Sequence, residues 1–595
     1  MTRVAIERRR HGLLGSGFLA LALQYVKRRP VNVKGVRLIR TPHVPHLLRP
    51  GGDHVIDPRH LHLLAGGFDC PSIIEIAALE KAHSDWRGFP YPVPIQRNHR
   101  VSPSREWGNV YTPRGFGLSE VGDIEIFPHG DEMHLFHLTL PNHDVVQHAV
   151  STDGLTWKQL PDAFRTGDSG DCDDDMIWTM SVSEHDGQFH MLYTALARVE
   201  NGMVQRTGHA TSPDLIAWTK DTKNPVAQPD PRWYETDPAI TNMVSWRDPK
   251  PILIDGVWRA AVNARENRGP MLRRGCVGLF TSTDFETWEV QPPLFAPGRF
   301  WDLECPQVFT IAGHWYLSAG IMEERSQRYW MAEAPAGPWR QPRDGGILAP
   351  KGHYAGRIAR WKDQDIYMCW HTPSTGEADW NNAGNPHGKY VVAPLALKQR
   401  TDGTLACTSL DGWSALATGD PEPLTSSARS LYRDAAVANW RLETAVGELD
   451  FLANSDDYED FRLIATLTLE APVGGIGFRI EGETGGGYFL EIEERSDRVS
   501  LQKWLGATEP WTNRPTYAWR EIQSGRLRRP FAPGTPLAVQ MIVNGPYIEV
   551  SFDGEVLIAE LSAERTIGQI GIWAESGTVS LIEPVVTPLS RPRHS

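Results

Sequence analysis

The sequence predicts an all-β protein in which a five-bladed β-propeller is followed by a β-sandwich. Between about residues 115 and 415, short alternating apolar runs are separated by Gly, Asp and Pro, as in an all-β domain. A motif in this region recurs at intervals that fit one propeller blade. A turn-rich segment then leads into further alternating runs without helical periodicity, which indicates a sandwich. The length of 595 residues agrees with several domains, because it is too long for one hydrophobic core.

Residues 1–110 are predicted to form a short mixed extension with a helix near residues 72–83. Three arginines at 8–10 precede an apolar run at 13–23 that is similar to a signal-peptide core. Because the basic residues 27–29 follow without a small-residue cleavage site, the sequence favours a packed amphipathic helix, and a cytoplasmic over a secreted location. No run reaches the roughly 18 to 20 apolar residues of a transmembrane helix, so no membrane partner is expected.

Residues 111–415 carry the blade repeat. A strand with an aromatic-His pattern is followed by Ser/Thr-x-Asp-x-x-x-Trp, and the last copy is degenerate. The repeats end at four marker tryptophans, which lie 61, 70 and 51 residues apart: Trp157, Trp218, Trp288 and Trp339. This spacing fits four-stranded blades with insertions. Two more strands within residues 356–370 predict the fifth blade.

A linker and a second domain follow the propeller. Residues 416–430 are polar and rich in turn formers, which is typical of a linker. Residues 431–595 contain alternating runs at 461–467, 488–492 and 548–554. We therefore expect a concanavalin-like β-sandwich over residues 431–595.

The composition narrows the classes of partner. A formal net charge of −13 would repel a phosphate backbone, so a neutral substrate is expected and nucleic acid is not. The 22 tryptophans offer flat apolar faces for sugar rings, although Trp also fills β-sheet cores. The six cysteines are scattered and form no pair at metal-ligand spacing, so neither a metal nor another cofactor is expected.

Three carboxylates stand at the ends of apolar strands in different predicted blades: Asp123, Asp248 and Glu304. The innermost strands of a propeller converge on its central channel, so acids far apart in the sequence can meet there. Glycoside cleavage requires one ionised and one protonated carboxylate, and a third anion nearby raises the pKa of the acid. The alternative for each residue is a structural turn, since Asp caps strand ends and Asp-Pro starts turns.

The motifs around these acids resemble glycoside hydrolase family 32, the invertase and fructanase family. Arg-Asp-Pro at residues 247–249 and Glu-Cys-Pro at residues 304–306 occur in the family's order, and their acids lie 56 residues apart. The blade motif at residues 147–157 adds to this resemblance, which covers about residues 115–400. The ordered set on a blade repeat is far more specific than any one tripeptide.

The resemblance implies a glycosidase that cleaves a β-fructofuranoside-like bond by a retaining double displacement. Asp123 would be the nucleophile, Glu304 the acid/base, and Asp248 the residue that binds sugar hydroxyls. Arg247 is expected to hold Asp248 in a charge-assisted pair. The expected partner is an oligo- or polysaccharide.

Further substrate contacts are expected from Trp178 and Thr179, since Trp-Thr-Met-Ser is similar to a family motif. Asp175, His148 and Arg357 are secondary candidates. The acidic run at residues 171–175 could also be read as a calcium loop, but it lacks EF-hand spacing and a solvated loop is favoured.

One departure from the family leaves the substrate open. The usual Trp-x-Asn-Asp-Pro-Asn-Gly around the nucleophile is replaced by residues 120–126, in which Gly122 precedes Asp123. Related five-bladed arabinofuranosidases that invert configuration carry a similar set of acids. A non-catalytic carbohydrate-binding propeller is the third hypothesis.

For retention the carboxyls of Asp123 and Glu304 should lie roughly 5 to 5.5 Å apart, against about 6.5 to 9.5 Å for inversion.

Overall fold

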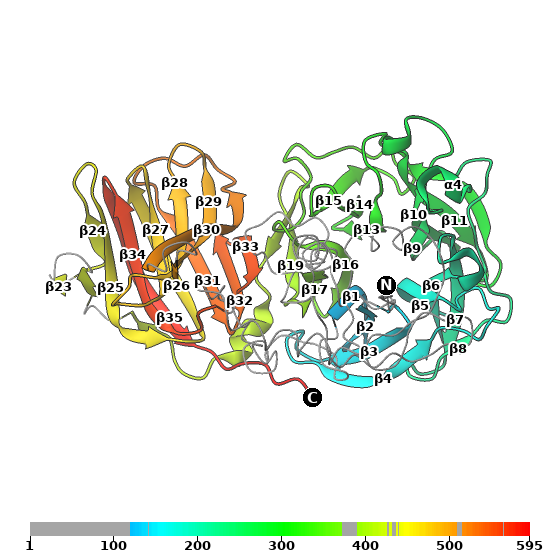
Figure 1. Cartoon of the computed structure of the whole chain (residues 1–595), viewed down its shortest axis with the longest axis horizontal. Coiled ribbons are helices and arrows are strands. Elements are labelled where there is room, and N and C mark those ends of the chain that lie inside the picture. The colour runs from blue at the N-terminus through cyan, green and yellow to red at the C-terminus, as the bar shows by residue number, and fades with distance from the viewer. Residues whose placement is uncertain are drawn as a thin grey trace, which may run out of the picture. The chain divides into compact units, whose positions relative to one another are not determined.

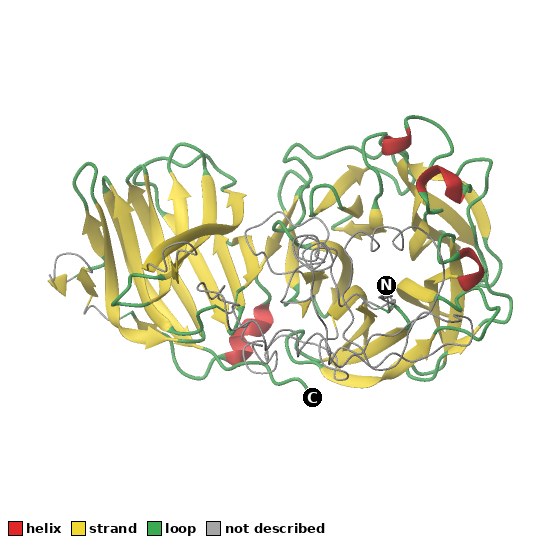
Figure 2. Ribbon diagram, in the orientation of Figure 1, coloured by secondary structure: helices red, strands yellow, loops and turns green. Residues whose placement is uncertain are grey.

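A computed structural model describes eight stretches of the chain, namely residues 120–140, 142–371, 390–424, 428–430, 436–437, 439–508, 515–562 and 564–595. These stretches belong to one compact unit, residues 101–595. The mixed extension and its helix, predicted within residues 1–110, lie outside the described residues. Strands and turns make up nearly all of the described chain, as Figure 2 shows. Its short helical segments are η2 (Arg198–Glu200), α4 (Pro238–Thr241), η3 (Met271–Arg273) and η4 (Asp411–Leu416).

Five antiparallel sheets follow one another along the first part of the chain. Sheet 1 consists of β1 (Glu120–His129), β2 (Glu132–Leu140), β3 (Val145–Ser151) and β4 (Lys158–Arg165). Sheet 2 consists of β5 (Met176–His185), β6 (Gln188–Leu196), β7 (Gln205–Ser212) and β8 (Thr219–Lys220). Sheet 3 consists of β9 (Trp246–Ile254), β10 (Val257–Arg265), β11 (Gly275–Ser282) and β12 (Glu289–Phe295).

Two further sheets complete this set. Sheet 4 consists of β13 (Glu304–Ile311), β14 (His314–Ile321) and β15 (Ser326–Ala332). Sheet 5 consists of β16 (Tyr354–Trp361), β17 (Gln364–His371), β18 (Tyr390–Val391), β19 (Leu395–Gln399) and β20 (Leu405–Thr408).

The first strands of the five sheets form a closed ring. β1 contacts β5, β5 contacts β9, β9 contacts β13, β13 contacts β16, and β16 contacts β1 again. Figure 1 shows these five strands innermost around a common centre. Apolar cores fill the spaces between neighbouring sheets, for example Phe136 with Met180 between sheets 1 and 2, and Tyr234 with Trp246 near sheet 3. The predicted five-bladed propeller is confirmed.

The repeated Ser-x-Asp motif is a turn that hydrogen-bonds its own backbone. In sheet 1, Asp153 Oδ1 accepts from the N–H groups of Leu155 at 2.8 Å and Thr156 at 2.6 Å. Asp214 and Asp284 accept in the same way in sheets 2 and 3, and these bonds lower the pKa of both carboxyls. Such side-chain bonds make Asp and Ser favourable at turns, which explains why the motif recurs at blade edges.

The fourth sheet differs from the predicted four-stranded blade. It has three strands among the described residues, and the chain after β15 pairs with it through isolated bridges, such as Met331 with Arg340. The motif copy here is the degenerate one, with Pro335 and Pro338. This copy lacks the Ser and Asp side chains that hydrogen-bond the turn backbone in sheets 1 to 3.

Each innermost strand carries an irregularity at its channel end. The pairing register shifts between Val121 and Ile124 in β1, and at corresponding places in β5, β9, β13 and β16. In β9, β13 and β16 the extra residues are Asp248, Cys305 and Ala355, which have positive φ angles of 64°, 46° and 54°. Bulges change the direction of side chains and occur next to active sites. Their presence in all five inner strands therefore indicates that the functional site lies in the channel.

The C-terminal part of the chain is a sandwich of two antiparallel sheets. One sheet contains β21 (Glu422–Pro423), β24 (Arg441–Glu443), β26 (Phe461–Glu470), β31 (Leu537–Asn544), β32 (Tyr547–Phe552), β33 (Glu555–Leu561) and β35 (Thr578–Pro588). The other contains β22 (Ala428–Ser430), β23 (Ala436–Val437), β25 (Leu449–Tyr458), β27 (Val473–Ile480), β28 (Gly487–Glu493), β29 (Arg498–Thr508), β30 (Pro515–Arg526) and β34 (Gly568–Glu575).

Apolar side chains from both sheets form the sandwich core, in which Leu463 and Ile572 are fully buried. Two short strands, β21 and β22, lie within the range predicted as linker and pair with this sandwich. Another apolar cluster includes Tyr367 of the propeller and Tyr547 of the sandwich, so the two domains share buried surface. The predicted fold class, a propeller followed by a sandwich, is confirmed.

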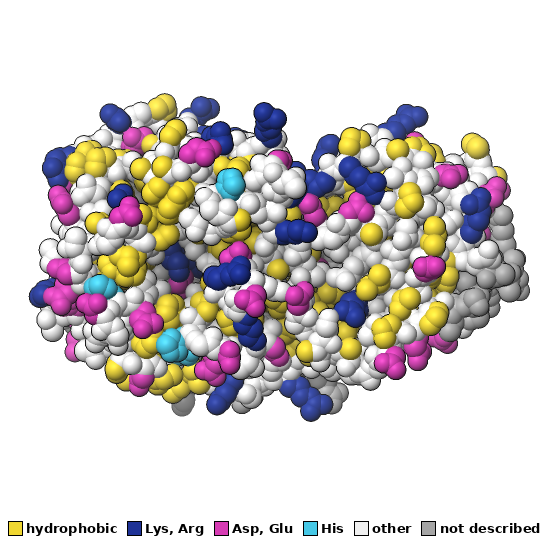
Figure 3. Space-filling model, turned by 180° about the vertical axis from the view of Figure 1, so that it is seen from behind, with side chains coloured by type: hydrophobic (Ala, Val, Ile, Leu, Met, Phe, Trp, Pro, Cys, Tyr) yellow, Lys and Arg dark blue, Asp and Glu magenta, His cyan; other side chains and the backbone are white. Residues whose placement is uncertain are grey.

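Charged side chains of both signs lie on the surface of the described residues. Figure 3 shows acidic and basic side chains interspersed over the face that it draws. Among the helices of the described stretches, none is long and apolar enough to cross a membrane.

Candidate active site

Asp123 lies in the register shift of β1, and two neighbouring blades hold its carboxylate. Trp370 Nε1 donates to Asp123 Oδ1 at 2.6 Å from sheet 5, and the Thr179 hydroxyl donates to Oδ2 from sheet 2. Asp123 itself is half-buried. With both oxygens bound from fixed strands, the carboxylate has one defined orientation and keeps a face toward the channel.

Asp248 is almost fully buried and is held from both sides. Its backbone N–H donates to Thr194 Oγ1 at 3.0 Å, and its Oδ2 accepts from the backbone N–H of Cys305 at 2.9 Å. Asp248 Oδ1 has no hydrogen-bond partner within the described part of the chain. Burial and the charge of Asp123 raise the pKa of Asp248, which Arg247 opposes. A buried carboxylate oxygen without a partner is costly, so this oxygen is suited to a ligand hydroxyl.

Glu304 begins β13, and its side chain is largely buried. Its Oε1 accepts a hydrogen bond from the Arg247 guanidinium at 2.6 Å. Burial raises its pKa to about 8, and the negative charges of Asp248 and Asp302 add to the effect against the opposing charge of Arg247. Glu304 is therefore protonated at neutral pH, with its proton on Oε2 because Oε1 faces a donor.

Arg247 binds different partners from the one predicted. Its guanidinium donates to Asp302 Oδ2 at 2.8 Å and to Glu304, whereas Arg247 Nε lies 3.7 Å from Asp248 Oδ2, beyond hydrogen-bond distance. Both side chains reach β13, where Arg247 donates to Glu304 and Asp248 Oδ2 accepts from the backbone N–H of Cys305. The expected charge-assisted pair with Asp248 is thus an ion pair at longer range, and its hydrogen-bonding place is taken by the Cys305 backbone.

The carboxylates of Asp123 and Asp248 and the Cys305 thiol form a tight group. One oxygen of each carboxylate and Cys305 Sγ all lie within 4.8 Å of one another. Burial raises the pKa of the Cys305 thiol well above its usual value. The thiol is therefore uncharged beside the two carboxyl groups.

The comparisons with known proteins agree with this geometry. The family model for the glycosyl hydrolases family 32 N-terminal domain matches residues 125–379, a range that contains Asp248 and Glu304 and begins two residues after Asp123. The chain carries a glycosyl hydrolase family 32 N-terminal domain.

The curated relatives named here are a β-fructofuranosidase and a fructan exohydrolase. The chain is 33% identical over 178 residues to the β-fructofuranosidase, insoluble isoenzyme CWINV5, of Arabidopsis thaliana, and this covers 29% of each chain. It is 29% identical over 191 residues to the fructan 6-exohydrolase of Beta vulgaris, which covers 30% of each chain. The chain thus aligns with less than a third of the length of these relatives.

Solved structures extend the similarity in fold to most of the chain. The exo-inulinase of Aspergillus awamori has a TM-score of 0.61 and 16% identity, covering 82% of this chain and 98% of its own. A fructan 1-exohydrolase IIa of Cichorium intybus, solved in complex with 1-kestose, has a TM-score of 0.57 and 16% identity, covering 82% of this chain and 97% of its own. The shared architecture includes both the propeller and the sandwich.

Three of the predicted substrate-binding residues of the family 32 domain lie near the carboxylates. Thr179 donates to Asp123, and Arg247 binds Glu304. Arg357 is fully buried, and its Nε lies 3.3 Å from Glu125 Oε2. The charge of Arg357 acts to lower the pKa of Asp248, but its buried side chain does not offer an exposed contact to a substrate.

The remaining predicted contacts are placed differently. Trp178 is half-buried and packs against His143 at 5.5 Å between ring centroids. Asp175 is half-buried before β5, with Arg198 Nε at 3.9 Å. His148 lies on β3, two strands away from the channel, fully buried and stacked on Phe136 at 4.1 Å. Burial lowers the pKa of His148 to about 3, with His134 contributing, so the ring is neutral and its position argues against substrate contact.

Acidic residues in the run at 171–175, before β5, are paired with protein groups. Asp173 is buried and pairs with Lys220, and it accepts from the Tyr193 hydroxyl at 3.1 Å. Asp174 accepts from the backbone N–H of Arg198 at 2.7 Å and of Gly170 at 2.9 Å, and these bonds lower its pKa. These contacts explain the run as a structural loop.

The sequence did not single out three features of the site. The sequence does not distinguish Trp370 from the other strand tryptophans, or Asp302 from the other acids near strand ends. Glu125 is fully buried two residues after Asp123, where it binds Lys250 and accepts from the Val182 N–H at 3.2 Å. The sequence does contain a signal for Glu125. It stands at a core-facing position of an apolar strand, and a charged residue at such a position requires a partner.

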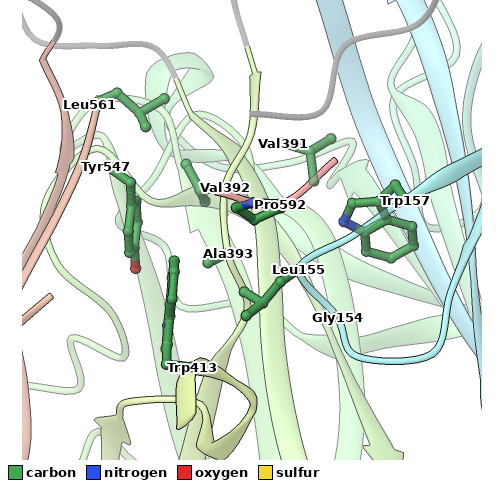
Figure 4. A pocket seen from close by; sticks show the side chains of 10 residues that line it. All are labelled: Gly154, Leu155, Trp157, Val391, Val392, Ala393, Trp413, Tyr547, Leu561 and Pro592. Atoms are coloured by element: carbon green, nitrogen blue, oxygen red, sulfur yellow. The ribbon is translucent and has the colours of Figure 1, made fainter. Parts of the chain in front are cut away.

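A separate pocket, drawn in Figure 4, has none of the three carboxylates in its lining. It is apolar, and Trp413 and Tyr547 stack there with centroids 5.4 Å apart. Its lining residues are Gly154, Leu155, Trp157, Val391, Val392, Ala393, Trp413, Tyr547, Leu561 and Pro592. None of these residues carries a carboxylate, so this pocket has no means of glycoside chemistry.

Gly122, which stands beside the candidate nucleophile where the family has Asn, has no room for a side chain. A Cβ at this position would lie 2.9 Å from Leu138 Cβ. We expect Gly122→Ala to lower the free energy of unfolding by about 1–3 kcal/mol, as overpacking does in cores. Denaturant unfolding would measure it. Gly419→Ala is the matched control, because no atom lies within 4 Å of its Cβ position, and an equal effect at both sites would contradict the steric explanation.

Proposed function

We propose that the protein hydrolyses β-fructofuranoside-like bonds by a retaining double displacement. The observation that carries this proposal is the difference between two carboxyl groups of one channel. Glu304 is buried with a pKa of about 8, whereas Asp123 is half-exposed and has both oxygens held by donors. Two carboxyls with opposed environments are the requirement for acid and nucleophile in glycoside cleavage.

In the first step, an oxygen of Asp123 attacks the anomeric carbon of the furanoside. The bond between this carbon and the glycosidic oxygen breaks, and Glu304 gives its proton to the departing oxygen. The product is a glycosyl ester on Asp123 and a free alcohol. Thr179 and Trp370 keep the attacking carboxylate fixed, so little of its orientational freedom is lost in the step.

In the second step, the ionised Glu304 accepts a proton from water, and the water oxygen attacks the anomeric carbon. The ester bond breaks, which restores Asp123 and the protonated Glu304. Arg247 stabilises the ionised form of Glu304 between the steps, because its guanidinium already donates to Oε1. Two displacements at the same carbon leave the configuration retained.

Asp248 is proposed to bind the sugar. Its Oδ1 is buried without a partner among the described residues, and its Oδ2 is anchored to the Cys305 backbone. An acceptor fixed in this way can take hydrogen bonds from two neighbouring hydroxyls, which strengthen as positive charge develops on the ring.

The names of the relatives support fructose as the sugar. They include a β-fructofuranosidase and a fructan 6-exohydrolase, and a fructan 1-exohydrolase of the same fold was solved with 1-kestose. Gly122 in place of the family's Asn is the observation that favours a second candidate, an arabinofuranosidase-type activity. The shared chemistry is cleavage of a five-membered sugar ring.

A substrate screen tests the proposal. The purified protein would be assayed on sucrose, 1-kestose, inulin, levan and aryl arabinofuranosides, with sugar release followed by chromatography. We expect fructose from at least one fructoside and no arabinose. Release of arabinose alone would replace the first candidate by the second. Binding of these sugars without release would leave a non-catalytic binding protein and contradict both.

A further inference from the structure

The end of β17 joins the candidate nucleophile to the sandwich domain. Its last two residues are Trp370 and His371, and successive side chains of a strand point to opposite faces. Trp370 faces the channel, where its Nε1 donates to Asp123 at 2.6 Å. His371 faces the other way, and its Nε2 lies 2.6 Å from Glu560 Oε1 on β33. One dipeptide therefore contacts both the catalytic carboxylate and the second domain.

His371 and Glu560 form an ion pair in a closed environment. Their side chains are 1% and 2% exposed. The second ring nitrogen, His371 Nδ1, faces the carbonyl oxygen of Gly352 at 3.1 Å. Because both nitrogens face acceptors, both carry hydrogen and the ring is an imidazolium. Burial acts to lower the pKa of His371, but the charge of Glu560 outweighs it and the pKa is raised.

Further hydrogen bonds fix this junction. His353 Nε2 lies 3.0 Å from the carbonyl oxygen of Ala559, the residue before Glu560. Gln523 Nε2 donates to the same oxygen at 2.9 Å and to the carbonyl of Lys351 at 2.6 Å. Glu560 Oε1 also accepts from the backbone N–H of Leu561 at 2.8 Å. The carboxylate that holds His371 is thus itself immobile.

We propose that Glu560 and His371 are positioning residues for Asp123. By fixing the end of β17, the buried pair holds Trp370 in the orientation in which its indole N–H meets the Asp123 carboxylate. The inference rests on the proposed function, since Asp123 is the nucleophile there. It links the sandwich domain to the candidate site, because Glu560, the counter-charge of the buried His371, lies on β33 of that domain.

The test is Glu560→Gln, which keeps the volume and removes the charge. Small displacements of reacting groups cost up to about 100-fold in rate, so we expect kcat to fall about 10- to 100-fold while KM changes less than about 3-fold. The control is Glu549→Gln. Glu549 is also buried, on the neighbouring strand β32, but it binds Ser409 and Tyr547 instead of His371. We expect kcat of this variant within about 2-fold of the unaltered protein.

A double variant separates positioning from general destabilisation. We expect Trp370→Phe to lower kcat, and Glu560→Gln to add little in that background, since both changes act through one contact. Fully additive effects, or equal losses of kcat in Glu560→Gln and Glu549→Gln, would overturn the inference. If Glu560→Gln does not fold, Glu560→Asp is the second variant, because it keeps the charge on a shorter side chain. The inference would also be overturned if this variant loses the ion pair with His371 but keeps both an unaltered kcat and the Trp370–Asp123 hydrogen bond.

A crystal structure of Glu560→Gln provides a measurement independent of turnover. We expect the distance between Trp370 Nε1 and Asp123 Oδ1 to exceed 3.5 Å, against 2.6 Å in the unaltered chain. An unchanged distance would overturn the positioning role, whatever the activity. Absence of furanosidase activity in the unaltered protein would instead contradict the proposed function, so the two failures are distinguishable.

Discussion

Asp123→Ala is expected to abolish turnover of every furanoside substrate, with a loss of about 10⁴-fold or more in kcat. No covalent intermediate can form without this carboxylate, so a good leaving group should not rescue the variant. Initial rates on sucrose and on an aryl furanoside would measure the loss. The fold should persist, because Asp123 is half-buried and its donors come from neighbouring strands.

Two controls make this result specific. Asp123→Asn keeps the size of the side chain and an acceptor for Thr179 or Trp370, so it should fold like the unaltered protein and remain inactive. Asp284→Asn changes a turn at the edge of sheet 3 and should leave kcat unaltered. Substantial hydrolysis of an aryl furanoside by Asp123→Ala would remove Asp123 as the nucleophile.

Glu304→Ala is expected to lower activity by an amount that depends on the leaving group. Substrates with a poor leaving group, such as sucrose, should lose about 10²- to 10⁴-fold, because their departing oxygen requires a proton. An aryl glycoside whose leaving group needs no proton should still complete the first step. Burst kinetics of aryl release would show this step, and equal losses on both substrates would indicate that Glu304 has a binding or structural role.

Added azide reveals the anomeric configuration of the product that Glu304→Ala releases. With the general base removed, azide can attack the glycosyl ester on Asp123 and release a glycosyl azide of retained configuration. Nuclear magnetic resonance of the product would assign the configuration. An azide of inverted configuration would contradict the double displacement and favour the inverting, arabinofuranosidase-type alternative.

The pH profile should carry the signature of Glu304. Because its pKa in the folded protein is about 8, kcat/KM is expected to fall as pH rises through about 8, where the acid loses its proton. The contribution of Glu304 to the free energy of unfolding also falls as pH rises. The pKa lies above the roughly 4.3 of an unfolded Glu, so this group's contribution to the free energy of unfolding is complete below about pH 4.3 and is lost as pH rises toward 8. In Glu304→Ala, the alkaline limb near pH 8 should disappear.

The sequence by itself determined the fold class and the three acids. Its Ser-x-Asp turns predicted the blades because the motif works locally, through bonds from Asp153 to backbone two and three residues away. The order of Asp123, Asp248 and Glu304 on separate blade strands predicted a shared site because inner strands converge in any propeller. Both predictions therefore rest on features that can be read within short segments, namely turn hydrogen bonds and the position of each acid on its strand.

The tertiary structure alone decided how the acids are held. Trp370 reaches Asp123 across 247 residues of sequence, and Arg247 turns from its neighbour Asp248 to Asp302 and Glu304. His148 fitted the motif but is buried in a blade core. Such partners depend on strand bulges and on how blades meet when the ring closes, and no periodicity within one strand records that geometry.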